Sequence, residues 1–215
     1  MDFLRQLDLV KEEALQVPIA IVGCGGIGSF AALALAKMGC RNLILYDDDL
    51  VEDHNVPNQF YRPEDVGKAK VEALSEILAA FADLHPEVHH ERVDGHRLQG
   101  IAIACVDSME ARKAIWQKSI RYRASVKLYI DARMGAEVSR IYMVRPVDPD
   151  DVRFYEKTLY DDAEAAQLPC TASAIIYNGF SIAGLIGNQV KKFVMGEGVK
   201  REILCDLATL TLIAT

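Results

Sequence analysis

Residues 21–29 read IVGCGGIGS and separate two segments of different hydrophobic periodicity. Residues 18–22 form a short apolar run with β-branched side chains, which is typical of a strand buried on both faces. Residues 26–38 carry apolar side chains at helical spacing and are followed by Gly39, which predicts a helix with a glycine C-cap. We therefore predict that this stretch is the turn from a buried strand into a helix.

Three glycines of this turn, Gly23, Gly25 and Gly28, have the spacing G-x-G-x-x-G. Between a strand and a helix, such glycines permit a tight turn, close approach of the backbone to a phosphate and close packing of helix on strand. The helix N-terminus adds unpaired N–H groups and a partial positive charge. Asp47 follows Gly28 by 19 residues, at the end of the next apolar run, where a carboxylate can accept from ribose hydroxyls. This pattern predicts a nucleotide site; the alternative is a structural turn in an α/β domain.

The composition is that of an ordinary globular protein, with 215 residues, 51% hydrophobic and 26% charged. The net charge of -7 argues against duplex DNA or an anionic membrane as the main partner. The cysteines lack any C-x-x-C spacing, so we expect reduced thiols, a cytoplasmic location and no zinc; they are Cys24, Cys40, Cys105, Cys170 and Cys205.

Two segments raise the question of targeting. Residues 1–11 carry acids and lack a long apolar core, so they do not read as a signal peptide. Residues 168–190 carry no charge, which is long enough for a membrane span, yet they include Ser, Thr, Asn and Gln side chains. We therefore predict that this run is a buried helix.

The periodicity along the chain predicts strands and helices in alternation up to Arg133. Strands are expected at 18–22, 42–47, 87–93, 101–106 and 126–131, and helices at 3–16, 26–38, from Pro63 to before Pro86, and 108–121. Such alternation predicts a parallel sheet with right-handed crossovers. After Arg133 we expect a strand at 137–144, an acidic segment at 147–168, a long helix to about 195 and a last strand at 208–214. The predicted fold class is α/β, a Rossmann-like three-layer fold whose parallel sheet is extended by antiparallel C-terminal strands.

Ligands of open parallel sheets bind beyond the carboxyl ends of the strands, so the residues that follow each strand are considered together. At this point the chain resembles the ThiF/MoeB/HesA family, the adenylating fold of the ubiquitin-activating enzymes, from about Arg5 to Val194. Five matching pieces carry the resemblance in the family's order and spacing: Gly23-x-Gly25-Gly26-x-Gly28, Asp47-Asp48-Asp49-Leu50-Val51-Glu52, Asn55-x-x-x-Gln59, Gly67-x-x-Lys70 and Asp107-Ser108-x-x-x-Arg112.

The resemblance implies a single adenylation domain over residues 1–215, with an N-terminal helix at 1–16 and a nucleotide-binding half at 17–133. A C-terminal extension at 134–215 would include a crossover segment at 145–170. The implied activity is ATP- and Mg²⁺-dependent adenylation of the C-terminal carboxylate of a ubiquitin-like or sulfur-carrier protein ending in Gly-Gly, with release of pyrophosphate, by a homodimer. Attack of one anion on the α-phosphorus of another depends on positioning and charge neutralisation more than on proton transfer.

The resemblance also implies roles for individual residues. Asp107 would hold Mg²⁺ through a hard oxygen ligand, or it could be the N-cap of the following helix. Lys70 would meet phosphates as a point charge, or it could be a solvated helix lysine. Asp47 would bind ribose, and Asp49 would orient a neighbouring base or the metal shell. The remaining expected nucleotide-binding residues are Gly23, Gly25, Gly26, Gly28, Asn55, Asn58 and Gln59. Asn55 and Gln59 would line the triphosphate side, or either could simply structure the loop. Arg5 would reach across a dimer into the partner's phosphates.

The chain departs from the family pattern at Asn58, where an arginine commonly precedes the loop glutamine. The missing phosphate contact would come from Arg62 or from Arg5 of a partner chain, and non-catalytic halves of ubiquitin-activating heterodimers also lose this arginine. Zinc cysteine pairs are absent, and residues 144–169 are too few for the separate cysteine domain of the eukaryotic enzymes. Pro169-Cys170-Thr171 nevertheless resembles the surroundings of their thioester cysteine. Cysteine is also a common buried small residue, and we favour this second interpretation for Cys170.

Two further readings differ in class from an adenylyltransferase. An NAD-dependent oxidoreductase is compatible with the glycine loop and Asp47, but it has no evident use for Lys70 and Asp107. A non-catalytic partner subunit of an activating enzyme is suggested by Asn58 and opposed by the retention of Asp47, Lys70 and Asp107.

Overall fold

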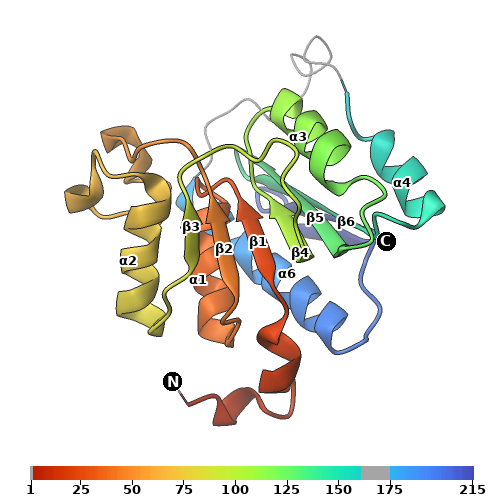
Figure 1. Ribbon diagram of the computed structural model, residues 1–215, viewed down its shortest axis with the longest axis horizontal. Coiled ribbons are helices and arrows are strands. Elements are labelled where there is room, and N and C mark those ends of the chain that lie inside the picture. Colours follow the sequence, from red (N-terminus) through yellow and green to blue (C-terminus); the bar gives the residue numbers. More distant parts are fainter. Residues whose placement is uncertain (1, 161–174) are drawn as a thin grey trace.

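The computed structural model describes residues 2–160 and 175–215, and its described part contains one eight-stranded sheet (Figure 1). The strand order is β3-β2-β1-β4-β5-β6-β7-β8. The strands are β1 (Ile19–Val22), β2 (Leu43–Tyr46), β3 (Glu87–His89), β4 (Gly100–Ala104), β5 (Val126–Gly135), β6 (Val138–Val144), β7 (Glu202–Asp206) and β8 (Thr211–Ala214).

The strand directions confirm the predicted fold class. β3, β2, β1, β4 and β5 pair in parallel, and β6, β7 and β8 continue the sheet in antiparallel fashion. The chain leaves β1 toward β2 on one side and returns to pair β4 on the other, so the strand order reverses at β1. A crevice at such a reversal, beyond the carboxyl ends of the strands, is where doubly wound folds bind ligands.

Helices cover both faces of the sheet and complete the three layers (Figure 1). α1 (Gly28–Met38), α2 (Lys70–Ala82) and α6 (Ile176–Val194) pack on one face, where they share a core with inward side chains such as Ile21 and Leu45. α3 (Met109–Ile115) and α4 (Pro149–Glu156) pack on the other face, around Trp116 and Tyr155. In the described part of the chain, no helix is both long and apolar enough to cross a membrane.

The predicted N-terminal helix over 3–16 is wrong. The structure has two short 3₁₀ turns instead, Leu4–Gln6 and Glu12–Gln16. A helix in water depends on burying an apolar face, and here only Val10 and Leu15 of the apolar pattern are buried, whereas the side chains of Leu4, Leu7 and Leu9 are exposed.

The predicted helix from Pro63 is also displaced. Pro63–Asp65 is a single 3₁₀ turn, and the chain then passes through Gly67 with φ +90° before α2 begins at Lys70. Residues 49–51 cause this, because they pair with residues 67–70 through Val51 N–H to Lys68 O (2.8 Å) and Gly67 N–H to Val51 O (2.8 Å). Lys70 is therefore the first residue of its helix, whereas the helix predicted from Pro63 placed it in the interior.

Other boundaries differ less. β3 ends at His89, β5 continues to Gly135, and the helix after Asp107 ends in a π-helical turn, Trp116–Ile120. β7 was not predicted, and the expected strand at 208–214 is reduced to β8, because residues 207–210 form the turn of a β7–β8 hairpin. The expected start of the long apolar helix falls within residues 161–174, outside the described residues, and α6 is described from Ile176.

Candidate functional site

The loops that follow β1, β2 and β4 are bonded to one another at the reversal point. Gly23 N–H donates to Tyr46 O (2.8 Å), and Cys105 N–H donates to Val22 O (2.7 Å). Cys24 N–H donates to Asp47 Oδ2 at 2.6 Å, which joins the glycine loop to the acid after β2. The predicted nucleotide-binding segments therefore meet at one edge of the sheet.

The three glycines of the loop differ in how much space the surrounding atoms leave for a side chain. Gly23 has φ +93°, and a Cβ there would lie 2.9 Å from the carbonyl carbon of Cys105. A Cβ on Gly28 would lie 1.8 Å from Gly23 O. A Cβ on Gly25 would meet only the Gln59 amide, at 3.8 Å or more, which is ordinary van der Waals contact. The fold demands glycine at 23 and 28, whereas at 25 it leaves open the space that a closely bound phosphate would need.

Four successive N–H groups of this loop are unpaired. Within residues 2–160 and 175–215, the N–H groups of Gly25, Gly26, Ile27 and Gly28 have no hydrogen-bond acceptor. These are the free donors at the start of α1, where the helix dipole also favours negative charge. The loop thus has the donor set of an anion site.

Asp47 stands beside these donors and is half-buried. Its Oδ2 accepts from Cys24 N–H (2.6 Å) and its Oδ1 accepts from Asp49 N–H (2.9 Å). Burial raises the pKa of the Asp47 carboxyl, although these two N–H groups act in the opposite direction. Each oxygen retains acceptor capacity, which is what the predicted ribose contact requires.

Lys70 is buried, which contradicts the solvated-lysine alternative. Its side chain is 9% exposed, and Nζ lies 2.7 Å from Asp49 Oδ2. Its backbone N–H donates to the carbonyl of the same aspartate at 3.0 Å. The Lys70 ammonium group is thereby kept near the carboxyl ends of the strands, where the glycine loop also lies.

Asp107 is exposed and does not cap α3. The N-cap is Ser108, whose Oγ accepts from Ala111 N–H at 3.2 Å, so the capping alternative for Asp107 is wrong. The Asp107 carboxylate has no hydrogen-bond or ion-pair partner among the residues described here. It does contribute, after Asp48 and Asp49, to raising the pKa of Arg92, whose Nε lies 2.8 Å from Asp48 Oδ2.

Hard oxygen ligands gather at this edge of the sheet. One carboxylate oxygen from each of Asp47, Asp48 and Asp49 lies within 4.8 Å of the others. These oxygens fit the chemistry of Mg²⁺, which prefers carboxylate and phosphate oxygens, and Asp107, which is outside this group of three, offers a further exposed carboxylate after β4. The residues that would hold the ion are thus present.

In the loop after β2, Asn55 has a structural role, whereas Asn58 and Gln59 keep oxygens that are unpaired within the described residues. Asn55 is buried and its Oδ1 accepts from Glu52 N–H at 2.9 Å, which closes a capping box around a 3₁₀ turn and gives this asparagine a structural task. In contrast, Asn58 Oδ1 and Gln59 Oε1 are buried and have no hydrogen-bond partner among residues 2–160 and 175–215. Unpaired buried acceptors are uncommon, and Gln59 has one next to Gly25.

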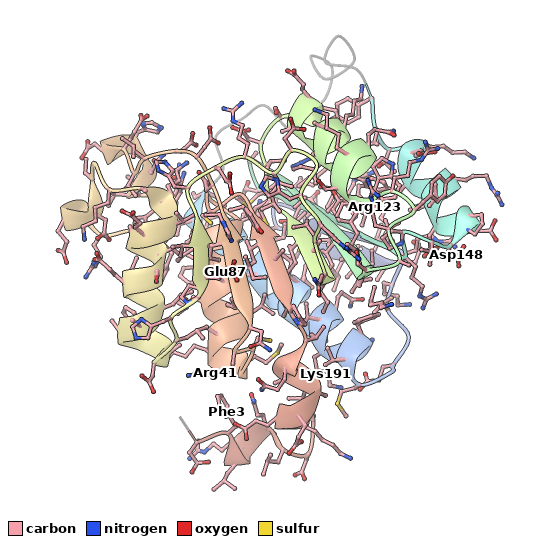
Figure 2. The ribbon with its side chains drawn as sticks, viewed as in Figure 1. Phe3, Arg41, Glu87, Arg123, Asp148 and Lys191 are labelled. Atoms are coloured by element: carbon pink, nitrogen blue, oxygen red, sulfur yellow. The ribbon has the colours of Figure 1, made fainter. Side chains whose placement is uncertain are left out.

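Neither arginine suggested for the missing charge lies free beside the loop. The guanidinium of Arg62 contacts Asp65 (2.7 Å), Glu64 (3.0 Å) and Glu76 (3.3 Å), so its charge is already neutralised. Arg5 is exposed in the 3₁₀ turn Leu4–Gln6 at the opposite end of α1, where Gln6 Nε2 donates to Met38 O at 2.6 Å. Figures 1 and 2 show this N-terminal segment, marked by Phe3, far from the arrowheads of β1 and β2. Within one chain, Arg5 is not brought to the site.

Two hydroxyl groups at the site were missed by the sequence analysis. The Tyr61 hydroxyl donates to Cys24 O at 2.7 Å and lies 3.3 Å from Lys70 O. Ser29 Oγ donates to Gly25 O at 2.7 Å and accepts from Phe60 N–H at 3.0 Å. The contacts Tyr61–Cys24 and Ser29–Phe60 each join residues more than thirty positions apart. For this reason, nothing in the local sequence indicates them. Cys170 lies outside the described residues.

A strand reversal, a glycine turn with free N–H groups, an acid after β2 and a buried lysine define a Rossmann-like nucleotide-binding domain. The family model described as the ThiF family matches residues 4–212, and the chain belongs to this family. The predicted family is confirmed.

Curated relatives agree with this membership, and solved structures share the fold. The ubiquitin-like modifier-activating enzyme 5 of Gallus gallus is 28% identical over 91% of this chain and 55% of the relative, and that of Rattus norvegicus is 29% identical over 91% and 54%. The chain thus spans about half the length of these curated relatives. The structure of E. coli MccB with AMPCPP and MccA has a TM-score of 0.71 at 18% identity, and that of PaaA has a TM-score of 0.73 at 22% identity. Each of the two matches covers 95% of this chain and 65% of the solved chain. At these identities the two structures establish the fold.

Proposed function

We propose that this chain is a cytoplasmic adenylyltransferase that uses ATP and Mg²⁺ to activate a carboxylate and releases pyrophosphate. The observation that carries the proposal is Lys70, a buried cation whose only ion-pair partner in the described residues is the exposed Asp49. Hydride transfer has no use for such a group, whereas a triphosphate offers it several anionic oxygens. E. coli MccB, which shares the fold, has been solved with ATP, and this supports the same ligand here.

Some residues of the site would bind the nucleotide, and others would hold the metal ion that neutralises charge. The N–H groups of residues 25–28 and Lys70 Nζ would bind the phosphates, and Asp47 would hold the ribose. Asp107 would hold Mg²⁺, with Asp49 of the acidic group after β2 as a second candidate ligand, and the ion supplies positive charge to the phosphate oxygens when bound. A substrate carboxylate oxygen attacks the α-phosphorus, and the bond from that phosphorus to the bridging oxygen of the β-phosphate breaks. No proton needs to be removed, so the site requires no general base.

We propose the C-terminal carboxylate of a ubiquitin-like or sulfur-carrier protein, ending in Gly-Gly, as the substrate. Support comes from the relatives named ubiquitin-like modifier-activating enzyme 5 and from MccB, which has been solved with MccA. The test is exchange of labelled pyrophosphate into ATP in the presence of candidate carriers. Exchange that requires both Mg²⁺ and an intact Gly-Gly end supports the proposal, and tight binding of NAD with none of ATP contradicts it.

A homodimer with shared sites is the second part of the proposal. Asn58 leaves the loop without the arginine of the family, Arg62 is neutralised by acids, and Arg5 lies at the far end of its own chain. Around Arg5, the side chains of Leu4, Leu7 and Leu9 are exposed at 70%, 47% and 64%, which is an apolar surface that a second copy would cover. A two-fold dimer would thus give two equivalent sites, each completed by the partner's Arg5.

A further inference from the structure

We propose that Tyr61 is a positioning residue of this site, whose hydroxyl fixes the backbone of the glycine loop relative to the backbone of Lys70. The proposal rests on the function proposed above, because it concerns how the phosphate-binding groups are aimed. The expected site residues would contact the nucleotide or the metal directly, whereas Tyr61 would orient the backbone that binds the phosphates.

The Tyr61 hydroxyl is buried between two backbone carbonyls. Tyr61 is 6% exposed, and its hydroxyl lies between two carbonyls, that of Cys24 at 2.7 Å and that of Lys70 at 3.3 Å. One carbonyl belongs to the glycine loop and the other to the first residue of α2. Burial raises the pKa of the hydroxyl well above its ordinary value, so it stays a neutral donor at physiological pH.

Planarity of the peptide bond makes the Cys24 contact informative. The carbonyl of Cys24 and the N–H of Gly25 belong to one peptide plane and point in opposite directions. A hydroxyl that holds the carbonyl inward therefore aims the Gly25 N–H outward. Ser29 Oγ does the same for the next peptide, since it holds the carbonyl of Gly25 at 2.7 Å and so aims the N–H of Gly26. Both N–H groups are among the four unpaired donors of the loop.

Glycine supplies the reason why the loop needs such bonds. A glycine has more accessible backbone conformations than any other residue, so a turn rich in glycine does not hold its N–H groups in one direction unaided. The Tyr61 hydroxyl supplies such a constraint from a distant segment. The Ser29 hydroxyl adds to the Ser29 N–H, which also donates to Gly25 O, at 3.1 Å.

The Lys70 contact completes the arrangement. The N–H of Lys70 donates to Asp49 O at 3.0 Å, and its carbonyl faces the Tyr61 hydroxyl. The backbone of Lys70 is thus held at its N–H by Asp49 and, through the longer branch of the shared hydroxyl proton, at its carbonyl by Tyr61. The side chain remains the part able to exchange Asp49 for a phosphate. Tyr61 therefore sets the distance between the two groups that would contact the nucleotide.

The experiment compares Tyr61→Phe with Tyr129→Phe, each of which removes one buried hydroxyl. Tyr129 is a matched control because its hydroxyl contacts that of Tyr155, at 3.3 Å, in the core on the α3 and α4 face. ATP with Mg²⁺ is titrated calorimetrically into each folded variant at a temperature well below its Tm, and the KM values for ATP and for the carrier are measured by pyrophosphate exchange.

We expect Tyr61→Phe to weaken ATP binding and to raise the KM for ATP by about fivefold to tenfold, the effect of one hydrogen bond, with the KM for the carrier unchanged. Tyr129→Phe should leave both KM values unchanged. Ser29→Ala, as a second variant at the neighbouring peptide, should also raise the KM for ATP. A wild-type chain that binds no ATP refutes the proposed function, whereas equal ATP affinities of the wild type and Tyr61→Phe, whatever their Tm values, refute the role of Tyr61 alone.

Discussion

Lys70 Nζ lies 2.7 Å from Asp49 Oδ2, and the two residues are 21 positions apart in the chain. The lysine side chain is 9% exposed and the aspartate side chain 60% exposed, so this is a buried cation held by a surface acid. A bound triphosphate would offer Lys70 more negative charge than one carboxylate does. We infer that Asp49 holds the lysine in place until a nucleotide takes over the contact.

Replacement of this lysine should abolish adenylation without unfolding the protein. Lys70→Met keeps most of the buried hydrocarbon and removes the charge, and we expect pyrophosphate exchange to fall by about a hundredfold or more, as for loss of one preorganised electrostatic contact. Lys68→Met is the control, because Lys68 pairs with Asp65 and Glu76 instead. A Lys70→Met variant that keeps most of its exchange activity would contradict the assigned role.

Asp107 should prove essential for activity and dispensable for stability. The side chain is exposed and has no polar partner in the part of the chain that the structure describes, so Asp107→Asn should leave Tm unchanged. Exchange should fall by about a hundredfold or more, and the Mg²⁺ concentration for half-maximal rate should rise. Glu110→Gln, at an exposed acid in the first turn of α3, is the matched control and should behave as wild type. Wild-type dependence on Mg²⁺ in the Asp107→Asn variant would remove Asp107 from the metal site.

Two alanine substitutions in the glycine loop should have opposite consequences. At Gly28 a Cβ would lie 1.8 Å from Gly23 O, so Gly28→Ala should lower Tm strongly or prevent folding. At Gly25 the nearest atom would be 3.8 Å away, so Gly25→Ala should fold with a Tm close to wild type and lose at least tenfold in ATP affinity, because the methyl group occupies the phosphate space. Thermal unfolding and calorimetric titration separate the two effects. Unchanged ATP affinity in Gly25→Ala would place the phosphates elsewhere.

The shared-site dimer is tested by complementation. Arg5→Ala chains and Lys70→Ala chains, each inactive alone, are mixed under conditions where subunits exchange. A mixed dimer then has one site with both defects and one site with neither, so partial activity should return. A monomer in light scattering at working concentration, or no recovery after demonstrated exchange, would exclude the contribution of Arg5 from the partner.

Local patterns were sufficient for the central part of the fold. The apolar runs and helical spacing around residues 18–38 predicted β1, α1 and the Gly39 cap, which the structure shows with φ +108° at Gly39. Alternation of strands and helices predicted the parallel sheet, and the spacing of glycines and acids predicted which loops meet at its edge. These features depend on periodicity and backbone geometry over a few residues, which a linear pattern records.

Contacts between distant segments settled the rest. The pairing of residues 49–51 with 67–70 buries Lys70 and moves the start of α2 to Lys70, and the Tyr61 hydroxyl reaches a glycine-loop carbonyl 37 residues away. The N-terminal segment fails to form its predicted helix because most of its apolar side chains find no surface to pack against in this chain. The partner of a polar group and the burial of an apolar one depend on which side chains meet once the loops have converged, and a local pattern along the chain does not specify those contacts.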